Sequence, residues 1–358
     1  MRSMNQHLQG LRASVLYGCL GMLAACGGGD DTSTVSRLGD DSHIATRAAA
    51  SGSSENATAP RKLPRAYNRT GITALALAPD GKTLAVTGAD GQVRVIDATR
   101  PHDAGLKRGQ LRGPATGVTF SGDGKYLLGV GHDSAVHVWS AGTGQELLTL
   151  SAHEHPLRSI VGSPDGALIA TVGEETRVML WNAATGRLRQ ILYGHTGFVN
   201  AAVFSNDSTL LATGGTEGRV LVWDVATGRL LYTLRGHGDS INALAFAPGS
   251  KLLASAGDDG NVLLWDVALK RQAGAFNGNG QPVRAVGFSP DGSLMVSGAE
   301  DGKLLVWDMS TRQLVETLVP GGAAINAVAF APGNKLVLFS ADEANLVQAW
   351  KLMPGALR

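Results

Sequence analysis

The side chains of this chain that could do chemistry are recurring sets of histidine, hydroxyl and carboxylate residues. In one set, His237, Ser255 and Asp259 offer an imidazole, a hydroxyl and a carboxylate, the three groups that together can activate a serine nucleophile. In three of these sets the histidine precedes a tryptophan by 28 residues. A catalytic site occurs once in a chain, whereas a structural device recurs. We therefore expect structural hydrogen-bonded units here and no catalytic residue.

Each set combines a His, a Ser or Thr, an acid and a Trp, and the copies differ in how complete they are. The fifth copy holds His237, Ser255, Asp259 and Trp265. The fourth holds His195, Thr213, Glu217 and Trp223, and the third holds His153, Thr171, Glu175 and Trp181. The sixth has Asn279 in place of His, with Ser297, Asp301 and Trp307. The first, second and seventh copies lack this histidine, so we expect their units to be partial or absent.

The elements that position these sets are copies of one segment of about 42 residues. Their tryptophans are Trp139, Trp181, Trp223, Trp265 and Trp307, spaced by 42, with Trp350 a further 43 residues along. Ile96 fills the same place in a degenerate first copy. The seven copies start near Ile72, Ala115, Leu157, Val199, Ile241, Val283 and Ile325. A period of 40–45 residues marked by Trp-Asp is typical of a four-stranded propeller blade.

The fourth copy shows the expected strands most clearly. They span residues 199–204, 210–213, 219–223 and 230–234, with turns at 205–208, 214–218 and 226–228. Strands of four to six residues between Gly-, Asp- and Asn-rich turns indicate a tight antiparallel meander. One such sheet cannot bury both faces, so neighbouring copies must stack. The sequence predicts an all-β, seven-bladed propeller of four-stranded antiparallel blades.

Residues 63–358 resemble the WD-repeat family through the Trp-Asp repeat and the four-residue sets. The resemblance implies that each set forms a hydrogen-bonded unit inside its blade, and that the propeller binds partners at the mouth of its central channel. The seventh copy stops soon after Trp350 without a fourth strand. We expect an N-terminal strand at residues 62–69 to complete the seventh blade and to remove its open edge.

One position at this mouth, just after each copy begins, is polar in most copies. It holds Thr116, Arg158, Asn200, Asn242, Arg284 and Asn326, with Thr73 or Ala74 in the first copy. Such a donor-rich ring suits a carboxylate, a phosphate or the carbonyl groups of a peptide. Phe198, Pro156 and Pro282 would form its edge, and Glu174, Asp258, Glu300 and Glu343 would lie further out. The alternative is a polar ring that is merely solvated.

The N-terminus resembles a bacterial lipoprotein signal. Residues 13–25 are apolar, too few to span a bilayer, and end in Leu-Ala-Ala before Cys26. The resemblance implies cleavage before Cys26 and lipidation of its thiol. Gly27, directly after this cysteine, indicates that the lipoprotein is retained in the outer rather than the inner membrane. Residues 26–61 are rich in Gly, Ser, Thr and Ala, which indicates a disordered tether. An ordinary secretory signal with a chance cysteine is the alternative. We therefore expect a signal peptide at residues 1–25, the lipidated cysteine and its tether at residues 26–61, and the propeller at residues 62–358.

Composition narrows the function further. The formal charge of +1 gives no reason for nucleic-acid binding, and the only two cysteines lie near the N-terminus, so we expect no thiolate metal site and no cofactor. Neither HExxH nor GxSxG occurs. We expect a monomeric, non-catalytic binding scaffold for a protein or peptide, lipid-anchored in the cell envelope. The alternatives are an outer-membrane assembly-type propeller, suggested by the Ala-Thr-Gly-Arg fragments at 184–187 and 226–229, and a propeller hydrolase.

Overall fold

The computed structural model describes residues 71–101, 105–151, 153–277 and 280–352, and in these ranges the chain forms β-strands joined by turns. No helix in the ranges described is long and apolar enough to cross a membrane. The expected leader and tether, with Cys26, lie outside the described residues.

The strands fall into four sets by their place in the repeat. The first strands are β1 (Ile72–Leu77), β5 (Ala115–Phe120), β9 (Leu157–Gly162), β13 (Val199–Phe204), β17 (Ile241–Phe246), β21 (Val283–Phe288) and β25 (Ile325–Ala331). The second strands are β2 (Thr83–Gly88), β6 (Tyr126–Gly131), β10 (Leu168–Gly173), β14 (Leu210–Gly215), β18 (Leu252–Gly257), β22 (Leu294–Ala299) and β26 (Asn334–Asp342). The third strands are β3 (Gln92–Asp97), β7 (Ala135–Ser140), β11 (Arg177–Asn182), β15 (Arg219–Asp224), β19 (Asn261–Asp266), β23 (Leu304–Asp308) and β27 (Val347–Lys351). The fourth strands are β4 (Leu106–Gln110), β8 (Glu146–Ser151), β12 (Leu188–Tyr193), β16 (Leu230–Arg235), β20 (Arg271–Asn277) and β24 (Leu314–Leu318).

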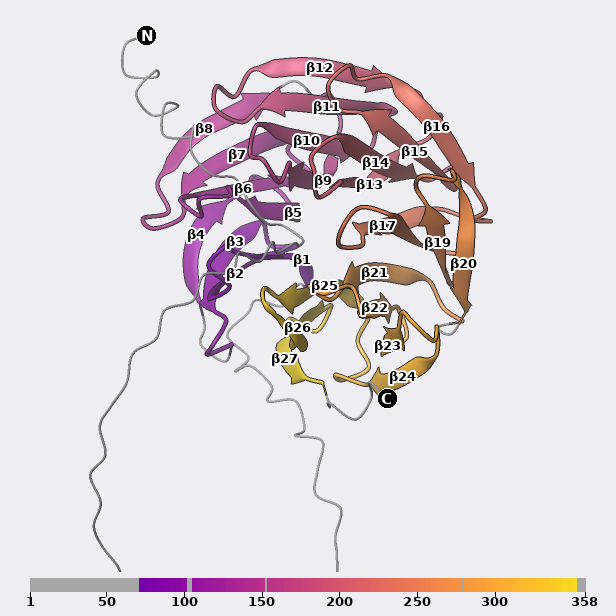
Figure 1. Cartoon of the computed structure of the whole chain (residues 1–358). Helices are drawn as coiled ribbons and strands as arrows, with labels where there is room; N and C mark the ends of the chain where they lie inside the picture. The colour runs from indigo at the N-terminus through magenta and orange to yellow at the C-terminus, as the bar shows by residue number, and fades with distance from the viewer. Residues whose placement is uncertain (1–70, 102–104, 152, 278–279, 353–358) are drawn as a thin grey trace, which may run out of the picture.

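These strands form seven antiparallel sheets, which we number as blades 1 to 7 in chain order. Each of the first six sheets has four strands in sequential order, and in the described residues blade 7 has three, β25 to β27. The first strands lie innermost and each contacts the first strand of the next blade, with β25 against β1 (Figure 1). The fourth strands form the outside of the wheel. The structure confirms the predicted all-β, seven-bladed propeller.

In blade 4 the second strand is longer than the sequence predicted, because it continues through Gly214 and Gly215 rather than turning there. Gly214 pairs with both neighbouring strands, and glycine is needed there because the next blade approaches closely. A Cβ atom on Gly214 would lie 2.6 Å from Cγ2 of Ile241, so only glycine lets the strand pass at this point.

The apolar core lies between the blades rather than at the centre of the wheel. One cluster joins Leu180 of blade 3 to Phe204 and Trp223 of blade 4, and another joins Ile72 of blade 1 to Phe339 of blade 7. Trp223 is 1% exposed. Each blade therefore depends on its neighbours for burial, as expected for a repeat architecture.

The predicted closing strand at residues 62–69 lies outside the described residues. The ring of first strands is nevertheless continuous, since β1 packs on β25 and Asn326 in β25 donates a hydrogen bond to the carbonyl of Ile72 over 2.7 Å.

Candidate functional site

A β-bulge near the start of the first strand positions the polar residues that the sequence singled out. In every blade the second residue of this strand has no partner in the ladder with the second strand. These bulged residues are Thr73, Thr116, Arg158, Asn200, Asn242, Arg284 and Asn326. Because a bulge adds one residue to one strand, it redirects the side chain away from the regular alternation of the sheet. The side chains therefore point toward the channel rather than into a blade interface.

All seven bulged residues line one cavity of about 750 Å³ at one end of the channel, which we call the mouth. The second-to-third-strand turns lie at the same end, and Asp258, Glu300 and Glu343 from these turns line the same cavity. Phe198 does not line it, but lies directly before β13 and is 47% exposed. The structure thus brings the predicted polar ring together and places Phe198 beside it.

Most of the polar ring links one blade to the next. The Asn200 side-chain amide donates to the carbonyl of Ile241 in the next blade over 3.1 Å, and Asn242 donates to Val283 over 3.2 Å. Thr73, Thr116 and Asn326 bind in the same way to the first residue of the following blade, over 2.6, 2.6 and 2.7 Å. These donors were expected to face a ligand. They line the mouth cavity and also satisfy carbonyl groups of neighbouring strands, so they have a structural role in joining the blades.

The two arginines of the ring form ion pairs instead. Arg158 Nη2 lies 2.7 Å from Glu174 Oε1, and Arg284 contacts both Glu300 and Glu343 at 2.5 Å. Burial alone would lower the pKa of Arg284, but its hydrogen bonds to Glu300 and Glu343 raise it above its usual value. Three of the acids that the sequence placed further out are therefore direct partners of the arginines, while the fourth, Asp258, accepts a hydrogen bond from Asn242 over 2.6 Å.

The predicted structural unit is complete in blade 5. His237 Nδ1 lies 2.9 Å from Asp259 Oδ2, and His237 Nε2 lies 2.7 Å from Ser255 Oγ. The indole N–H of Trp265 donates to the same Ser255 oxygen over 2.7 Å. Trp can only donate and a carboxylate can only accept, so the hydroxyl donates to Nε2 and Nδ1–H donates to Asp259.

Blades 3 and 4 contain the same unit with glutamate as the acid. Thr171 accepts from Trp181 over 2.8 Å and lies 2.6 Å from His153 Nε2. Thr213 accepts from Trp223 over 2.8 Å and lies 2.7 Å from His195 Nε2. The other ring nitrogens of the two histidines bind Glu175 and Glu217.

The burial of these units rules out the nucleophile that their residue types suggest. Thr171, Thr213 and Ser255 are each 0% exposed, so a substrate has no access to their hydroxyl groups. Burial lowers the pKa of His153, although its hydrogen bond to Glu175 opposes the shift. The imidazole is therefore neutral near neutral pH, and its two nitrogens are both occupied by fixed partners. Each unit therefore ties the loop before the first strand to the second and third strands of its own blade, which is a structural role.

Blades 6 and 7 each contain only part of the four-residue unit. In blade 6, Trp307 donates to Ser297 over 3.3 Å and Asp301 pairs with Lys303 at 2.7 Å, while Asn279 lies outside the described residues. In blade 7, Trp350 donates to Ser340 over 2.9 Å. Both blades therefore keep the hydroxyl–indole bond.

Blade 2 contains a histidine that the sequence analysis missed. His137 lies in β7, where its Nε2 is 3.0 Å from Asp133 and its Nδ1 is 2.7 Å from Glu146. Its ring stacks on Trp139 with centroids 5.5 Å apart. Opposite it on β6 is Gly129, at the position that holds Ser or Thr in blades 3 to 5. The sequence does contain a signal for this arrangement: a histidine lies two residues before the tryptophan, and a glycine replaces the Ser or Thr of the unit.

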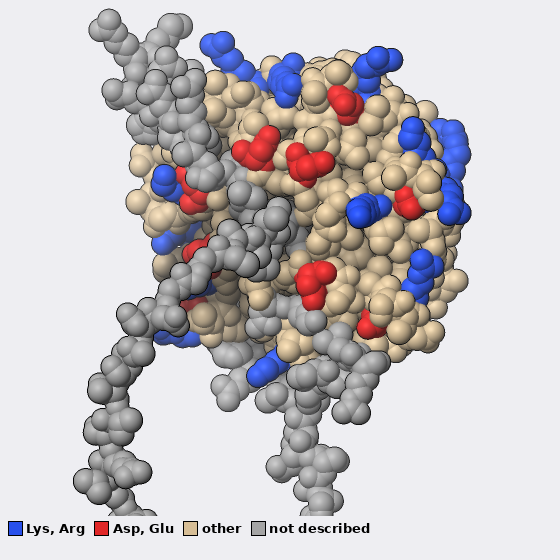
Figure 2. Space-filling view, viewed as in Figure 1, with Lys and Arg blue, Asp and Glu red and all other residues tan. Residues whose placement is uncertain are grey.

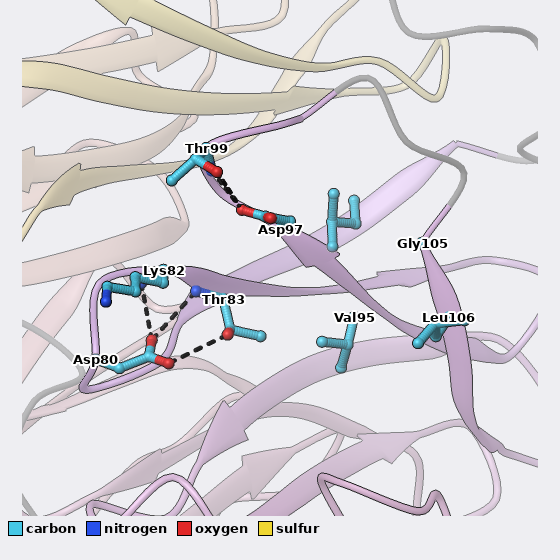
Figure 3. A pocket seen from close by; sticks show the side chains of 9 residues that line it. Asp80, Lys82, Thr83, Val95, Asp97, Thr99, Gly105 and Leu106 are labelled. Atoms are coloured by element: carbon cyan, nitrogen blue, oxygen red, sulfur yellow. Dashed lines mark hydrogen bonds between the residues drawn. The ribbon is translucent and has the colours of Figure 1, made fainter.

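A second cavity, of about 730 Å³, lies at the outer edge of blade 1 (Figure 3). Its two carboxylates cap their own turns. Asp80 accepts from the backbone of Lys82 over 2.8 Å, and Asp97 accepts from the Thr99 hydroxyl over 2.7 Å. These groups do not converge on a common point. In the described part of the chain no group of three His, Cys, Asp or Glu residues could hold a metal ion.

Comparison with known proteins supports the repeat. The family model WD40, described as WD domain, G-beta repeat, matches six segments that together cover more than half of the chain. The matched segments are residues 62–97, 107–140, 144–182, 186–224, 228–266 and 270–308. A search of curated protein sequences found no match.

Proposed function

Because this chain belongs to the WD40 family of repeat propellers, which commonly act as protein-interaction scaffolds, we propose that it is a docking module whose mouth binds a protein or peptide partner. The observation that carries this proposal is the cavity of about 750 Å³ at the mouth, which is lined by bulged polar side chains from all seven blades. Bulges next to a cavity commonly direct side chains toward a ligand.

The charges at the mouth favour a partner segment that carries basic or neutral polar groups. Arg158 and Arg284 face four carboxylates there, those of Glu174, Asp258, Glu300 and Glu343. Since each arginine is already ion-paired, a phosphate would have to displace a glutamate and meet the remaining negative charge. Ion pairs this exposed contribute only about 0–1 kcal/mol, so a lysine or arginine of a partner can exchange for one at little cost.

We also propose that the propeller is held in the bacterial cell envelope by lipid on Cys26, through the tether at residues 26–61. Each later family match begins at or near a fourth strand and ends in the third strand of the next blade, as residues 107–140 do with β4 to β7. Because the first match begins at residue 62, we propose that residues 62–69 take the place of a fourth strand and complete blade 7. Fourth strands run toward the mouth, and the tether would therefore leave from the opposite face.

Site-specific photo-crosslinking in intact cells tests the docking surface. A photoreactive residue at Phe198 is expected to capture a partner, and one at Gln145, exposed at the opposite end of blade 2, should not. The combined Phe198→Ala and Arg284→Ala changes should weaken binding of the captured partner. If both positions capture the same proteins, or the double variant binds equally well, the mouth is not the docking surface. Capture of an outer-membrane assembly protein would favour the assembly-type alternative.

The lipid anchor is tested by metabolic labelling with a fatty-acid analogue. The native chain should carry the label and resist extraction from membranes by high salt and high pH, whereas Cys26→Ser should lose both properties. A labelled Cys26→Ser protein would contradict lipidation at this residue.

A further inference from the structure

An exposed row of leucines lies on the face opposite the mouth. The third strand of each blade runs away from the mouth, so the third-to-fourth-strand turns are at the other end of the propeller. At the start of the fourth strands in blades 3, 4 and 6, and in the turn of blade 5, exposed leucines are 39–59% accessible. They are Leu188, Leu230, Leu231, Leu269 and Leu314, and we call this edge the lower rim.

A second β-bulge explains how adjacent leucines are both exposed. In blade 4, Val222 pairs with Tyr232 and Trp223 pairs with Leu230, so Leu231 has no partner in the ladder. Regular alternation would place one of two successive side chains in the interface with the next blade. Because of the bulge, Leu230 and Leu231 both face outward. The exposure is therefore built into the strand geometry.

Basic side chains alternate with these leucines. They are Arg187, Arg189, Arg229, Lys270, Arg271 and Arg312, and among the described residues none of them has an ion pair with an acid. Lys and Arg gather at the edge of the molecule over β12, β16 and β20, with Asp and Glu closer to its centre (Figure 2).

The acids of the lower rim are held within their own turns. Asp224 accepts from Thr227 over 2.6 Å, Asp266 from the backbone of Leu269 over 2.8 Å, and Asp308 from Ser310 over 2.6 Å. On the lower rim itself the six basic residues outnumber these three carboxylates, which makes this edge net positive. Three more exposed acids, Asp165, Asp207 and Asp291, lie on the same face in the first-to-second-strand turns, away from the fourth strands.

The lower rim is one continuous surface across four blades. Arg189 of blade 3 donates to the carbonyl of Ala226 in blade 4 over 3.1 Å. Tyr232 of blade 4 donates to Val267 of blade 5 over 3.1 Å, and Arg312 of blade 6 donates to Ala273 of blade 5 over 2.9 Å. In contrast, blade 2 has Gln145 and Glu146 where blade 3 has Arg187 and Leu188. Blade 1 again has an exposed leucine at the start of its fourth strand, Leu106, followed by Lys107, so blades 3 to 6 form the longest continuous stretch of this feature rather than its only occurrence.

We propose that the lower rim of blades 3 to 6 lies on a bilayer surface that contains anionic phospholipid, with its leucines in the interface and its basic residues on the headgroups. Leucines flanked by Lys and Arg match the composition of interfacial membrane-binding segments. Hot spots of protein interfaces are enriched in Trp, Tyr and Arg and poor in Leu. The rim shares the arginines, but its exposed apolar residues are leucines, and Tyr232 is covered by Lys270 at 5.3 Å. In this orientation the mouth faces away from the membrane. The inference depends neither on lipidation nor on what the mouth binds.

Vesicle binding tests this inference with the full chain carrying Cys26→Ser, so that no acyl group contributes. The protein should bind vesicles of mixed phosphatidylcholine and phosphatidylglycerol better than vesicles of phosphatidylcholine alone, and salt should weaken the binding. Arg187→Gln, Arg229→Gln and Lys270→Gln together should weaken it about 100-fold, because each basic residue near an anionic surface contributes about one kilocalorie per mole. Leu188→Thr, Leu230→Thr and Leu269→Thr together should weaken it at least about tenfold.

A matched control changes three exposed basic residues at the mouth end, Arg112→Gln, Arg235→Gln and Lys303→Gln, and should leave vesicle binding unchanged. Circular dichroism and thermal unfolding check that all variants remain folded. The inference is overturned if the control and the lower-rim variant bind equally, or if phosphatidylglycerol makes no difference. Capture of a protein by a photoreactive residue at Leu230, without vesicle binding, would instead identify the lower rim as a protein interface.

Discussion

Blades 4 and 7 occupy equivalent places in the wheel but differ in how their polar groups are satisfied. Blade 4 has four strands and the complete unit of His195, Glu217, Thr213 and Trp223. In the described residues blade 7 has three strands and keeps only the Trp350–Ser340 bond of this unit. The comparison teaches that a blade can lose the histidine and the acid of the unit while it keeps the bond between its tryptophan and its hydroxyl group.

Blades 4 and 7 each contain a buried acid, and the pKa values of these two acids are shifted in opposite directions. Burial alone would raise the pKa of Glu217, but the hydrogen bond and charge of His195, together with backbone hydrogen bonds, outweigh burial and lower the pKa. Asp342 in blade 7 is 1% exposed, and burial raises its pKa. Its Oδ1 accepts from the backbone of Ala344 and Leu346, and its Oδ2, like Oε2 of Glu217, is buried without a partner among the described residues. In this part of the chain Asp342 differs from Glu217 in having no histidine partner. Blade 7 is thus the blade that we expect to be least stable.

The largest effect should come from removing the strand proposed to complete blade 7. Deletion of residues 62–69 would leave β27 as an open edge and remove about five backbone hydrogen bonds, at a cost on the order of 5 kcal/mol. Thermal unfolding should then occur at a clearly lower temperature, with increased aggregation. Deletion of residues 40–47 in the proposed tether is the matched control and should have no effect. An unchanged Tm after deletion of 62–69 would show that the ring is not closed in this way.

The next largest effect should come from replacing a buried tryptophan, and the loss of stability should be greater in blade 4 than in blade 7. Trp223→Ala should destabilise the protein by about 3–5 kcal/mol, because it creates a cavity between two complete blades and leaves a buried hydroxyl without its donor. Trp350→Ala should cost about 3 kcal/mol or less, since blade 7 can relax more easily around the cavity. Urea unfolding measures both. Equal losses of stability would mean that blade 7 is packed as firmly as blade 4.

Removal of histidines should have a smaller effect and should distinguish blade 4 from blade 2. His195→Leu removes the acceptor of the Thr213 hydroxyl and the imidazole donor of the mostly buried Glu217, which should cost about 2–3 kcal/mol. His137→Leu should cost about 1 kcal/mol, since Glu146 is 46% exposed and can be hydrated instead. The same unfolding measurement applies. A larger loss for His137→Leu would show that its stacking on Trp139 is the stronger contribution.

The sequence was sufficient to predict the wheel because the 42-residue period places equivalent residues in equivalent sites. It located Arg158, Asn242 and the other mouth residues correctly, since their position in the repeat determines where they lie. It could not show that Asn242 donates to Val283, because that bond depends on the distance between two blades. It also missed His137, which satisfies Asp133 from a different position in the repeat.

The exposed leucines show a second limit. A strand pattern predicts that Leu230 and Leu231 face opposite sides, and only the register of β15 and β16 reveals the bulge that turns both outward. Similarly, the ion pair of Arg284 with Glu343 joins blades 6 and 7, so it depends on how two copies stack. Periodicity determines the position within a blade, whereas bulges and contacts between blades determine what each side chain meets.

The smallest effects should appear in the pH dependence of stability, where blades 3 and 7 should show opposite trends. Burial lowers the pKa of His153 below the value of 6.5 expected in the unfolded chain, so protonation favours unfolding and stability falls as the pH drops below about 6.5. For Asp342, whose pKa is raised from 3.8, ionisation favours unfolding, and stability is lost as the pH rises through and above about 3.8. Urea unfolding between about pH 4 and about pH 8 should therefore show that His153→Asn reduces the acid-side loss, while Asp342→Asn gains stability relative to the native chain as the pH rises. If the two variants change the pH profile in the same direction, the difference in how these blades satisfy their buried groups is not the cause.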